Sequence, residues 1–185
     1  MKIKILALFG PSGSGKDTLV KILTKQDNIN EIISCTTRPM REYEQDGVDY
    51  HFLTVQEFSQ KVLDGTMLEA TSFRDWFYGT PLESLDENKI NVGVFNIQGI
   101  ECLLKDPRLD VYPIFIACED KTRLLRTLNR ETSPDCEEIC RRFLTDLSDF
   151  EEIPFEYKTH YNGININPDW IIDDLSQSGL LTKTD

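Results

Sequence analysis

The stretch that decides the fold is Gly10-Pro-Ser-Gly-Ser-Gly-Lys16, which stands between an apolar run and a helical pattern. Residues 2–9 alternate and then become continuously apolar, as buried parallel strands do, and residues 17–25 have the spacing of a helix. The stretch fits the pattern G-x-x-x-x-G-K in the strand–loop–helix context that this pattern requires. It predicts a loop whose backbone N–H groups and lysine bind phosphate.

An α/β pattern continues around this loop. A second short strand ends at residues 32–34, and the β-rich runs at 91–96 and 111–117 are each followed by a helical pattern. Residues 119–152 predict two helices broken near Pro134, and residues 170–172 predict a last strand before a short terminal helix. Together these patterns predict an α/β fold in which helices cover both faces of a parallel sheet.

Residues 34–90 differ from this pattern and indicate a small inserted lobe. Short strands at residues 48–52 and 67–72 flank a helix whose start, Thr54-Val-Gln-Glu57, is a capping box. The length of 185 residues suits a single domain. The expected core of that domain comprises residues 1–33 and 91–185.

The charge of the chain excludes several classes of partner. A formal net charge of −12 repels nucleic acids and anionic membranes over most of the surface. The longest apolar runs are far shorter than the roughly 20 residues that span a bilayer. We expect a cytoplasmic protein that binds neither nucleic acid nor membrane and is a monomer or a weak homodimer.

Asp17 departs from the usual phosphate loop, which has Ser or Thr here to place a hydroxyl on Mg²⁺. A carboxylate beside a triphosphate is repulsive unless a cation lies between them. Two interpretations follow: Asp17 holds Mg²⁺, directly or through water, or it is an acid in the first turn of the helix.

Arginines are concentrated in two clusters although the chain as a whole is acidic. Three of them are spaced i, i+3 and i+7 and therefore share one face of a helix. Beside a phosphate loop, such a face predicts a lid that closes over phosphates. The clustered residues are Arg38, Arg41, Arg123, Arg126, Arg130, Arg141 and Arg142.

Further motifs follow the phosphate loop in a specific order. They are Ser34-Cys-Thr-Thr-Arg38-Pro-Met-Arg41, Gly47-Val-Asp-Tyr50-His-Phe52, Glu69, Tyr78-Gly-Thr80 and Gln98-Gly99. In this order and spacing the chain resembles the guanylate kinases over nearly its whole length, with no clear match at residues 154–168. The resemblance implies a fold of the P-loop NTPase type, an inserted lobe for the nucleoside monophosphate at about 34–90 and a helical lid at about 123–142.

The resemblance also implies the reaction and the residues that perform it. The reaction is ATP-dependent phosphorylation of GMP, dGMP or both, with Mg²⁺ as the cofactor and Asp17 as its candidate ligand. The implied catalytic residues are Lys16, Arg130 and Arg142. The implied ATP phosphate-binding residues are Gly10, Ser12, Gly13, Ser14, Gly15, Lys16, Asp17, Thr18 and Arg126. The implied GMP-binding residues are Ser34, Arg38, Arg41, Tyr50, Glu69, Tyr78, Thr80 and Asn96.

The base preference depends mainly on Glu69. Guanine presents N1–H and N2–H₂ donors that a carboxylate accepts, whereas adenine has no N1–H. Two carboxylates that the family usually carries at a strand end are replaced here by Val94 and Asn96. We hypothesise that Asp17 replaces the acid lost at Val94. Two alternatives stay open: a nucleoside or deoxynucleoside monophosphate kinase with another base preference, and a non-catalytic domain that binds a phosphopeptide.

Overall fold

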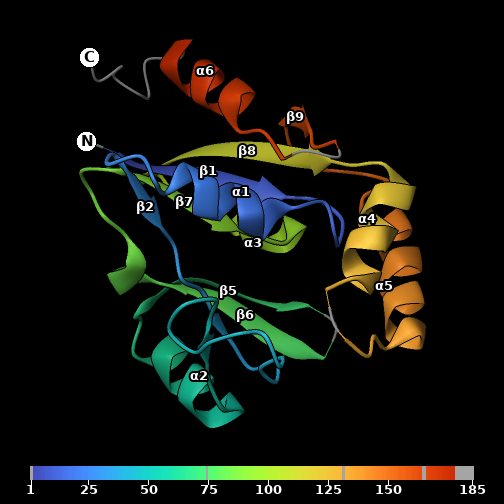
Figure 1. The fold of residues 1–185 in the computed structure, drawn as a ribbon. Coiled ribbons are helices and arrows are strands. Elements are labelled where there is room, and N and C mark those ends of the chain that lie inside the picture. The colour runs from blue at the N-terminus through green and yellow to red at the C-terminus, as the bar shows by residue number, and fades with distance from the viewer. Residues whose placement is uncertain (1, 74, 131, 164–165, 178–185) are drawn as a thin grey trace.

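The computed structural model describes residues 2–73, 75–130, 132–163 and 166–177. Its main sheet contains five strands in the order β2-β7-β1-β8-β9, and all of their pairings are parallel. Helices lie on both sides of this sheet, as the sequence predicts (Figure 1). The strands of the main sheet are β1 (Ile3–Phe9), β2 (Ile29–Glu31), β7 (Ile90–Val94), β8 (Leu109–Ala117) and β9 (Lys158–Tyr161), and the helices around it are α1 (Lys16–Leu23), α3 (Ile97–Lys105) and α6 (Asp169–Gln177).

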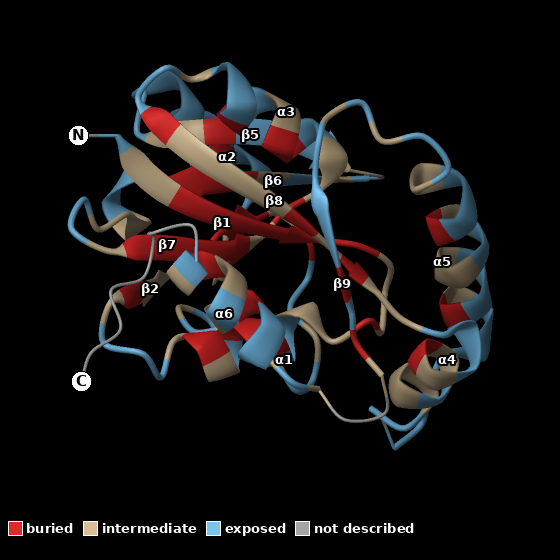
Figure 2. Ribbon diagram, turned by 90° about the horizontal axis from the view of Figure 1, so that it is seen from above, coloured by how far each residue is buried: buried red, intermediate tan, exposed pale blue. Residues whose placement is uncertain are grey.

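β1 lies in the middle of the sheet, between β7 and β8, and apolar side chains cover both of its faces. Leu6 and Leu8 pack with residues of α1 and α6, whereas Ile5 and Phe9 pack with residues of α3 on the other face. Successive side chains of a strand point to opposite faces, so a strand buried on both faces must be continuously apolar. The buried residues follow β1 and β7 through the centre of the molecule (Figure 2).

A second, smaller sheet lies beside the main one and has the strand order β4-β3-β6-β5. A helix packs beside this sheet, and its first turn is held by the expected capping box between Thr54 and Glu57. The elements are β3 (Cys35–Thr36), β4 (His51–Phe52), α2 (Val55–Leu63), β5 (Met67–Phe73) and β6 (Trp76–Pro81), followed by the short 3₁₀ turn η1 (Leu82–Ser84).

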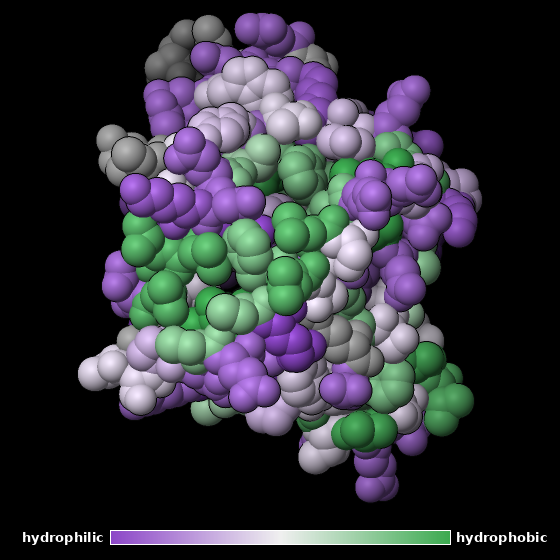
Figure 3. Space-filling model, turned by 90° about the vertical axis from the view of Figure 1, so that its right-hand side faces the viewer, coloured by the Kyte–Doolittle hydropathy of each residue, from purple (hydrophilic) through white to green (hydrophobic). Residues whose placement is uncertain are grey.

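Two helices stand at one side of both sheets (Figure 1). They are α4 (Asp120–Leu128) and α5 (Cys136–Asp149), and the break between them falls near Pro134 as predicted. The Asp135 side chain accepts the backbone N–H of Glu138 and so caps α5. The side of the molecule that carries these helices shows apolar surface between hydrophilic regions (Figure 3), and Leu125, Leu144 and Leu147 are exposed on α4 and α5.

Three secondary-structure predictions were wrong in type or position. Residues 170–172 belong to α6 rather than to a strand, because Ile171 and Leu175 lie one helical turn apart and are both buried in the core. The last strand is instead β9, for which the sequence analysis predicted no element. The second strand is β2, which ends at Glu31 and not at residues 32–34. Of the predicted strand at 48–52, only β4 is formed.

Within the described residues, no helix has the length and apolar character needed to cross a bilayer.

Candidate active site

A cavity of about 930 Å³ opens where the carboxyl ends of β1 and β7 meet the smaller sheet and the α4–α5 pair. Carboxyl ends of parallel strands are the usual position of ligand sites in open α/β sheets. The cavity brings together most of the residues that the sequence singled out: Gly10, Ser12, Gly13, Gly15, Lys16, Asp17, Ser34, Arg38, Arg41, Tyr50, Glu69, Tyr78, Asn96, Arg130 and Arg142. Ser14, Thr18, Thr80 and Arg126 are not among the residues that line it.

The phosphate loop connects β1 to α1 and has a backbone that requires glycine. Gly13 and Gly15 have φ angles of 78° and 92°, in the left-handed region that side chains disfavour. A Cβ atom at Gly13 would also lie 2.4 Å from the carbonyl oxygen of Arg123, and one at Gly15 would lie 2.6 Å from Nδ2 of Asn162. The loop therefore curls tightly against α4 and the segment that follows β9.

Lys16 is the first residue of α1 and lies across the loop. Its ammonium donates to the carbonyl oxygens of Gly10 at 2.8 Å and Pro11 at 3.0 Å. Burial lowers the pKa of Lys16 below its ordinary value, because desolvation disfavours the charged form. A nearby anion would offset this cost, so the lysine is suited to neutralising phosphate charge.

Two predicted ATP-binding residues lie behind the loop rather than in the cavity. Ser14 is completely buried. The guanidinium of Arg126 lies 3.4 Å from the carbonyl oxygens of both Gly13 and Ser14 and also donates to Gly163. Arg126 thus holds the back of the loop, which differs from its expected position at a phosphate. Thr18 is exposed on α1 and is not one of the residues that line the cavity.

Asp17 lies in the first turn of α1, lines the cavity and has a side chain that is 64% exposed. Mg²⁺ at phosphoryl-transfer sites is bound by one or two carboxylates together with water and substrate phosphates. An exposed carboxylate next to a phosphate loop fits that requirement. Among the described residues, no group of three or more His, Cys, Asp or Glu side chains is placed to hold a metal ion. Val94 lines the same cavity but offers no ligand atom.

The side of the cavity that residues 34–90 line is called the acceptor side. It contains two arginines that share one carboxylate. Arg38 is buried and forms a two-pronged pair with Glu44, with nitrogen–oxygen distances of 2.9 Å and 2.8 Å. Arg41 lies 3.5 Å from the same carboxylate and donates its backbone N–H to it. The sequence reasoning missed Glu44, although a buried arginine such as Arg38 requires a counter-charge. Glu44 fixes the plane of the Arg38 guanidinium and places a counter-charge beside that of Arg41.

Aromatic rings surround Arg38. Its guanidinium carbon lies 5.5 Å from the centroid of the Tyr50 ring and 5.6 Å from that of Phe52. The Tyr50 ring meets the Tyr78 ring edge to face, with centroids 6.2 Å apart. Burial raises the pKa of Tyr50 well above its ordinary value, so its hydroxyl stays protonated and can donate a hydrogen bond.

Glu69 projects from β5, is buried and lines the cavity. Its Oε1 accepts the hydroxyl of Thr80 at 2.8 Å, whereas its Oε2 has no hydrogen-bond partner among the described residues. Burial raises the pKa of Glu69 to about 7, and the Thr80 hydrogen bond opposes that rise. A ligand with two adjacent N–H donors would satisfy the unpaired oxygen and favour the ionised carboxylate. Thr80 therefore acts through Glu69 instead of lining the cavity itself.

Asn96 was expected to contact the base, but in the structure its side chain forms hydrogen bonds within the protein. Its Oδ1 accepts the backbone N–H of Gly99 at 2.7 Å and caps α3, and its Nδ2 donates to the Thr71 hydroxyl at 3.0 Å. Both ends of the amide are thus engaged within the protein, although the side chain lines the cavity. Asn is a preferred N-cap residue, which the sequence reasoning did not apply at this position.

The lid arginines approach the cavity from the α4–α5 side. Arg130 lies after α4, and its guanidinium is 3.8 Å from the Asp17 carboxylate. Arg142 lies on α5 and pairs with Glu138. Arg123 is buried instead of facing a ligand, because its guanidinium lies against the Phe143 ring and donates to Asp146 at 3.1 Å. Of Arg123, Arg126 and Arg130, which were expected to share one helix face, only Arg130 lines the cavity.

Asp146 is a site residue that the sequence reasoning missed. Its carboxylate accepts the backbone N–H of Ser12 at 2.8 Å and the guanidinium of Arg123 at 3.1 Å. The residue lies on α5, so it joins the phosphate loop to the α4–α5 pair. An acid within the amphipathic pattern of a helix carries no signal that would distinguish it from a solvated one.

Comparisons with known proteins show to which family the chain belongs. A family model described as "Guanylate kinase" matches residues 2–167, and so includes most of the stretch 154–168, where no clear match was expected. A guanylate kinase of Clostridium perfringens (strain 13 / Type A) is 36% identical over 168 residues, covering 88% of this chain and 76% of the relative. That of Prochlorococcus marinus (strain MIT 9312) is 36% identical over 165 residues, covering 85% and 89%. The crystal structure of guanylate kinase from Anaplasma phagocytophilum shares the fold, with a TM-score of 0.71, 24% identity and coverage of 98% and 89%. The chain belongs to the guanylate kinase family.

Proposed function

We propose that the chain transfers the γ-phosphoryl group of ATP to GMP, and that the residues brought together in the cavity are its active site. One observation carries the assignment. The buried Oε2 of Glu69 lacks a partner among the described residues and lines the same cavity as the phosphate loop with Lys16. A guanine base with adjacent N1–H and N2–H₂ donors supplies what this oxygen needs. Two arginines nearby suit the phosphate of the same nucleotide.

The proposed roles follow from charge and position. Lys16 and the loop N–H groups bind the ATP phosphates, and Arg38, Arg41 and Tyr50 hold the phosphate of GMP. An oxygen of that phosphate attacks the γ-phosphorus in line, the bond to the β,γ-bridging oxygen breaks, and ADP leaves. Arg130 and Arg142 neutralise charge on the phosphoryl group as it moves. The reaction needs no nucleophilic side chain.

The proposed mechanism includes two parts of the chain that close over the cavity. We assign residues 34–90 to the lobe that binds the monophosphate and residues 123–142 to the lid, with the remaining residues as the core. The smaller sheet contributes the acceptor side of the cavity, and α4 with α5 contributes the lid arginines. Closing these parts around the substrates would exclude water, which otherwise accepts the phosphoryl group of ATP.

A panel of nucleoside monophosphates tests the substrate assignment. With ATP and Mg²⁺, we expect GMP to be phosphorylated with a kcat/KM about 100-fold above that of AMP, CMP or UMP, because only guanine satisfies Glu69. dGMP belongs in the panel because it separates sugar from base recognition. ADP release in a coupled assay is the readout. Faster phosphorylation of AMP than of GMP would overturn the assignment of guanine as the base. Binding of a phosphopeptide without any phosphoryl transfer would overturn the assignment as an enzyme.

We also propose that Asp17 holds Mg²⁺ and so replaces the acid that Val94 lacks. The cation shields the phosphate charges and polarises the transferring group when it is bound. Asp17→Ala should raise the Mg²⁺ concentration for half-maximal rate about tenfold, and Asp17→Ser should raise it less, because a hydroxyl is also a Mg²⁺ ligand at this position.

The matched control is Asp27→Ala, which removes an exposed acid beyond the other end of α1. It should leave the Mg²⁺ requirement unchanged. Equal Mg²⁺ titrations for the wild type, Asp17→Ala and Asp17→Ser would show that Asp17 is only an acid of the first helical turn.

A further inference from the structure

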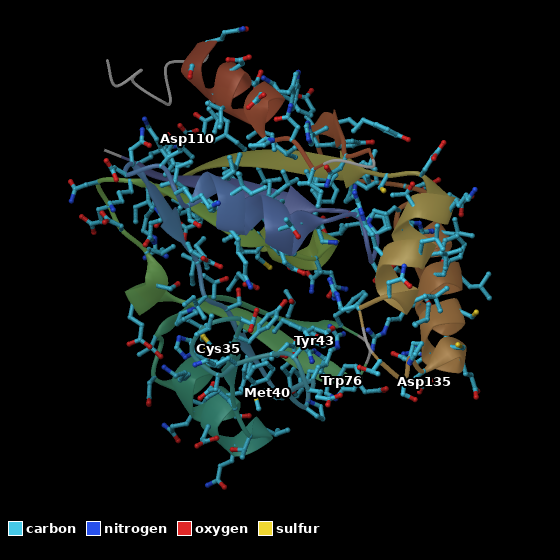
Figure 4. The ribbon with its side chains drawn as sticks, in the orientation of Figure 1. Cys35, Met40, Tyr43, Trp76, Asp110 and Asp135 are labelled. Atoms are coloured by element: carbon cyan, nitrogen blue, oxygen red, sulfur yellow. The ribbon has the colours of Figure 1, made fainter. Side chains whose placement is uncertain are left out.

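Tyr43 connects two parts of the cavity that the sequence places far apart. Its hydroxyl oxygen lies 3.3 Å from Nη1 of Arg41 and 3.2 Å from Nη1 of Arg130. The guanidinium carbon of Arg130 also lies 5.3 Å from the centroid of the Tyr43 ring. Figure 4 shows Tyr43 and Trp76 toward the end of the smaller sheet that is nearest to α4 and α5. Tyr43 therefore reaches from the acceptor side of the cavity to the lid.

The chemistry of this contact explains how two like charges stay close together. Arginine only donates hydrogen bonds, so the Tyr43 oxygen must accept from both guanidiniums through its two lone pairs. The ring face adds an attraction for the Arg130 cation. A neutral acceptor between two cations leaves both positive charges available to a further anion. Tyr43 is itself 42% exposed, so the fold does not need this ring to fill its core.

The contact is part of a continuous polar chain across the cavity. Glu44 lies 3.5 Å from Arg41 on the acceptor side, and Asp17 lies 3.8 Å from Arg130 at the phosphate loop. These contacts thus join the pocket for the monophosphate to the loop for the triphosphate, in the order Glu44, Arg41, Tyr43, Arg130 and Asp17. Tyr43 is its only uncharged member and the one that bridges the smaller sheet and the lid.

We propose that Tyr43 is a positioning residue that couples the grip on the acceptor phosphate to the placement of the lid arginine Arg130. This inference rests on the proposed function, because it concerns the reaction at the same cavity. Arg41 moves with the acceptor phosphate, the Tyr43 hydroxyl follows Arg41, and Arg130 is drawn to the transferring group. The consequence is a lid that is correctly placed only when the acceptor is held, which protects ATP from water.

Kinetics of Tyr43→Phe test the inference, because this variant keeps the ring and removes only the hydroxyl. We expect kcat to fall about tenfold with the KM for ATP unchanged, since the hydroxyl positions Arg130 for the transition state and not for ATP binding. Tyr161→Phe is the matched control, because Tyr161 is an exposed tyrosine on β9. It should leave kcat unchanged.

A double-mutant cycle separates positioning from a general structural effect. In an Arg130→Ala background, Tyr43→Phe should lower kcat by less than about twofold, because its effect passes through the missing arginine. Equal fold-changes in the two backgrounds, or an unchanged kcat in the wild-type background, would overturn the inference.

Amide hydrogen exchange distinguishes failure of this inference from failure of the proposed function, because it requires no activity. Exchange within residues 41–47 should become severalfold faster in Tyr43→Phe and in Arg130→Ala, since each change breaks the same contact. Unchanged exchange in both variants would overturn the inference whatever the enzyme does. Faster exchange in a chain that transfers no phosphoryl group would uphold the contact and refute the proposed function.

Discussion

Lys16→Ala is expected to lower kcat for GMP phosphorylation by about 1,000-fold, the size of effect seen when a transition-state charge contact is removed. The Lys16 ammonium lies within the phosphate loop, where it donates to the carbonyl oxygens of Gly10 and Pro11. Burial already lowers its pKa, so the free enzyme bears a desolvation cost that phosphate binding offsets. Steady-state ADP formation at saturating ATP and GMP measures the effect.

Lys21→Ala is the matched control for this change. Lys21 lies on the same helix, is 57% exposed and pairs with Asp49. We expect its loss to change kcat by less than about twofold, because exposed ion pairs contribute little. GMP affinity measured by calorimetry should be similar in the wild type and in both variants, which shows that the acceptor side is folded. A Lys16→Ala enzyme within tenfold of the wild type would refute the role of the loop lysine.

Glu69→Gln is expected to lower kcat/KM for GMP by about 100-fold, since a hydrogen bond to a charged group contributes roughly 1.5–3 kcal/mol and its loss also leaves guanine donors unpaired. The glutamine matches the carboxylate in size but presents one acceptor and one donor group. The loss should be much smaller for AMP, whose base has no N1–H. The ratio of the two kcat/KM values is the measurement, and an unchanged ratio would show that Glu69 does not read the base.

The pH dependence of the GMP KM provides a second readout of Glu69. Burial raises the pKa of this carboxyl to about 7 in the free protein, so its protonated form is favoured below that pH. This raised pKa means that protonation of Glu69 stabilises the folded state. The stabilisation is fully present below the pKa that the carboxyl has in the unfolded chain, and it is lost as pH rises through about 7. GMP binds the ionised form, so the KM for GMP should rise as pH falls below about 7. The phosphate of GMP also titrates near pH 6, and Glu69→Gln isolates that contribution because it removes the carboxyl.

The sequence predicted the parts of the fold in which local pattern and tertiary environment agree. The phosphate loop, the buried strand before it and the capping box at Thr54 all depend on short-range spacing that packing does not override. Residues 170–172 show the opposite case. Three apolar residues fit a strand or a helix, and only the burial of both Ile171 and Leu175 shows which one forms. β9 has a single buried residue, His160, so its pairing with β8 and not its sequence determines it.

Which residues meet in the cavity was predictable, but their partners were not. The resemblance located Arg38, Arg41 and Glu69, and all three line the cavity. Glu44 and Asp146 were missed because an acid acquires a role only through the groups that fold against it. The same reason explains Arg126, whose position on a helix face gave no indication that it would bind the back of the phosphate loop.

The stoichiometry of the products tests the central claim most directly, namely that a phosphate loop for ATP faces a pocket for GMP in one cavity. ATP, Mg²⁺ and GMP are incubated with the protein, and ADP and GDP are quantified by chromatography, with a parallel reaction that lacks GMP. The account predicts ADP and GDP in equal amounts, and ADP near background without GMP. ADP formed at the same rate without GMP, or no GDP in the complete reaction, would contradict it.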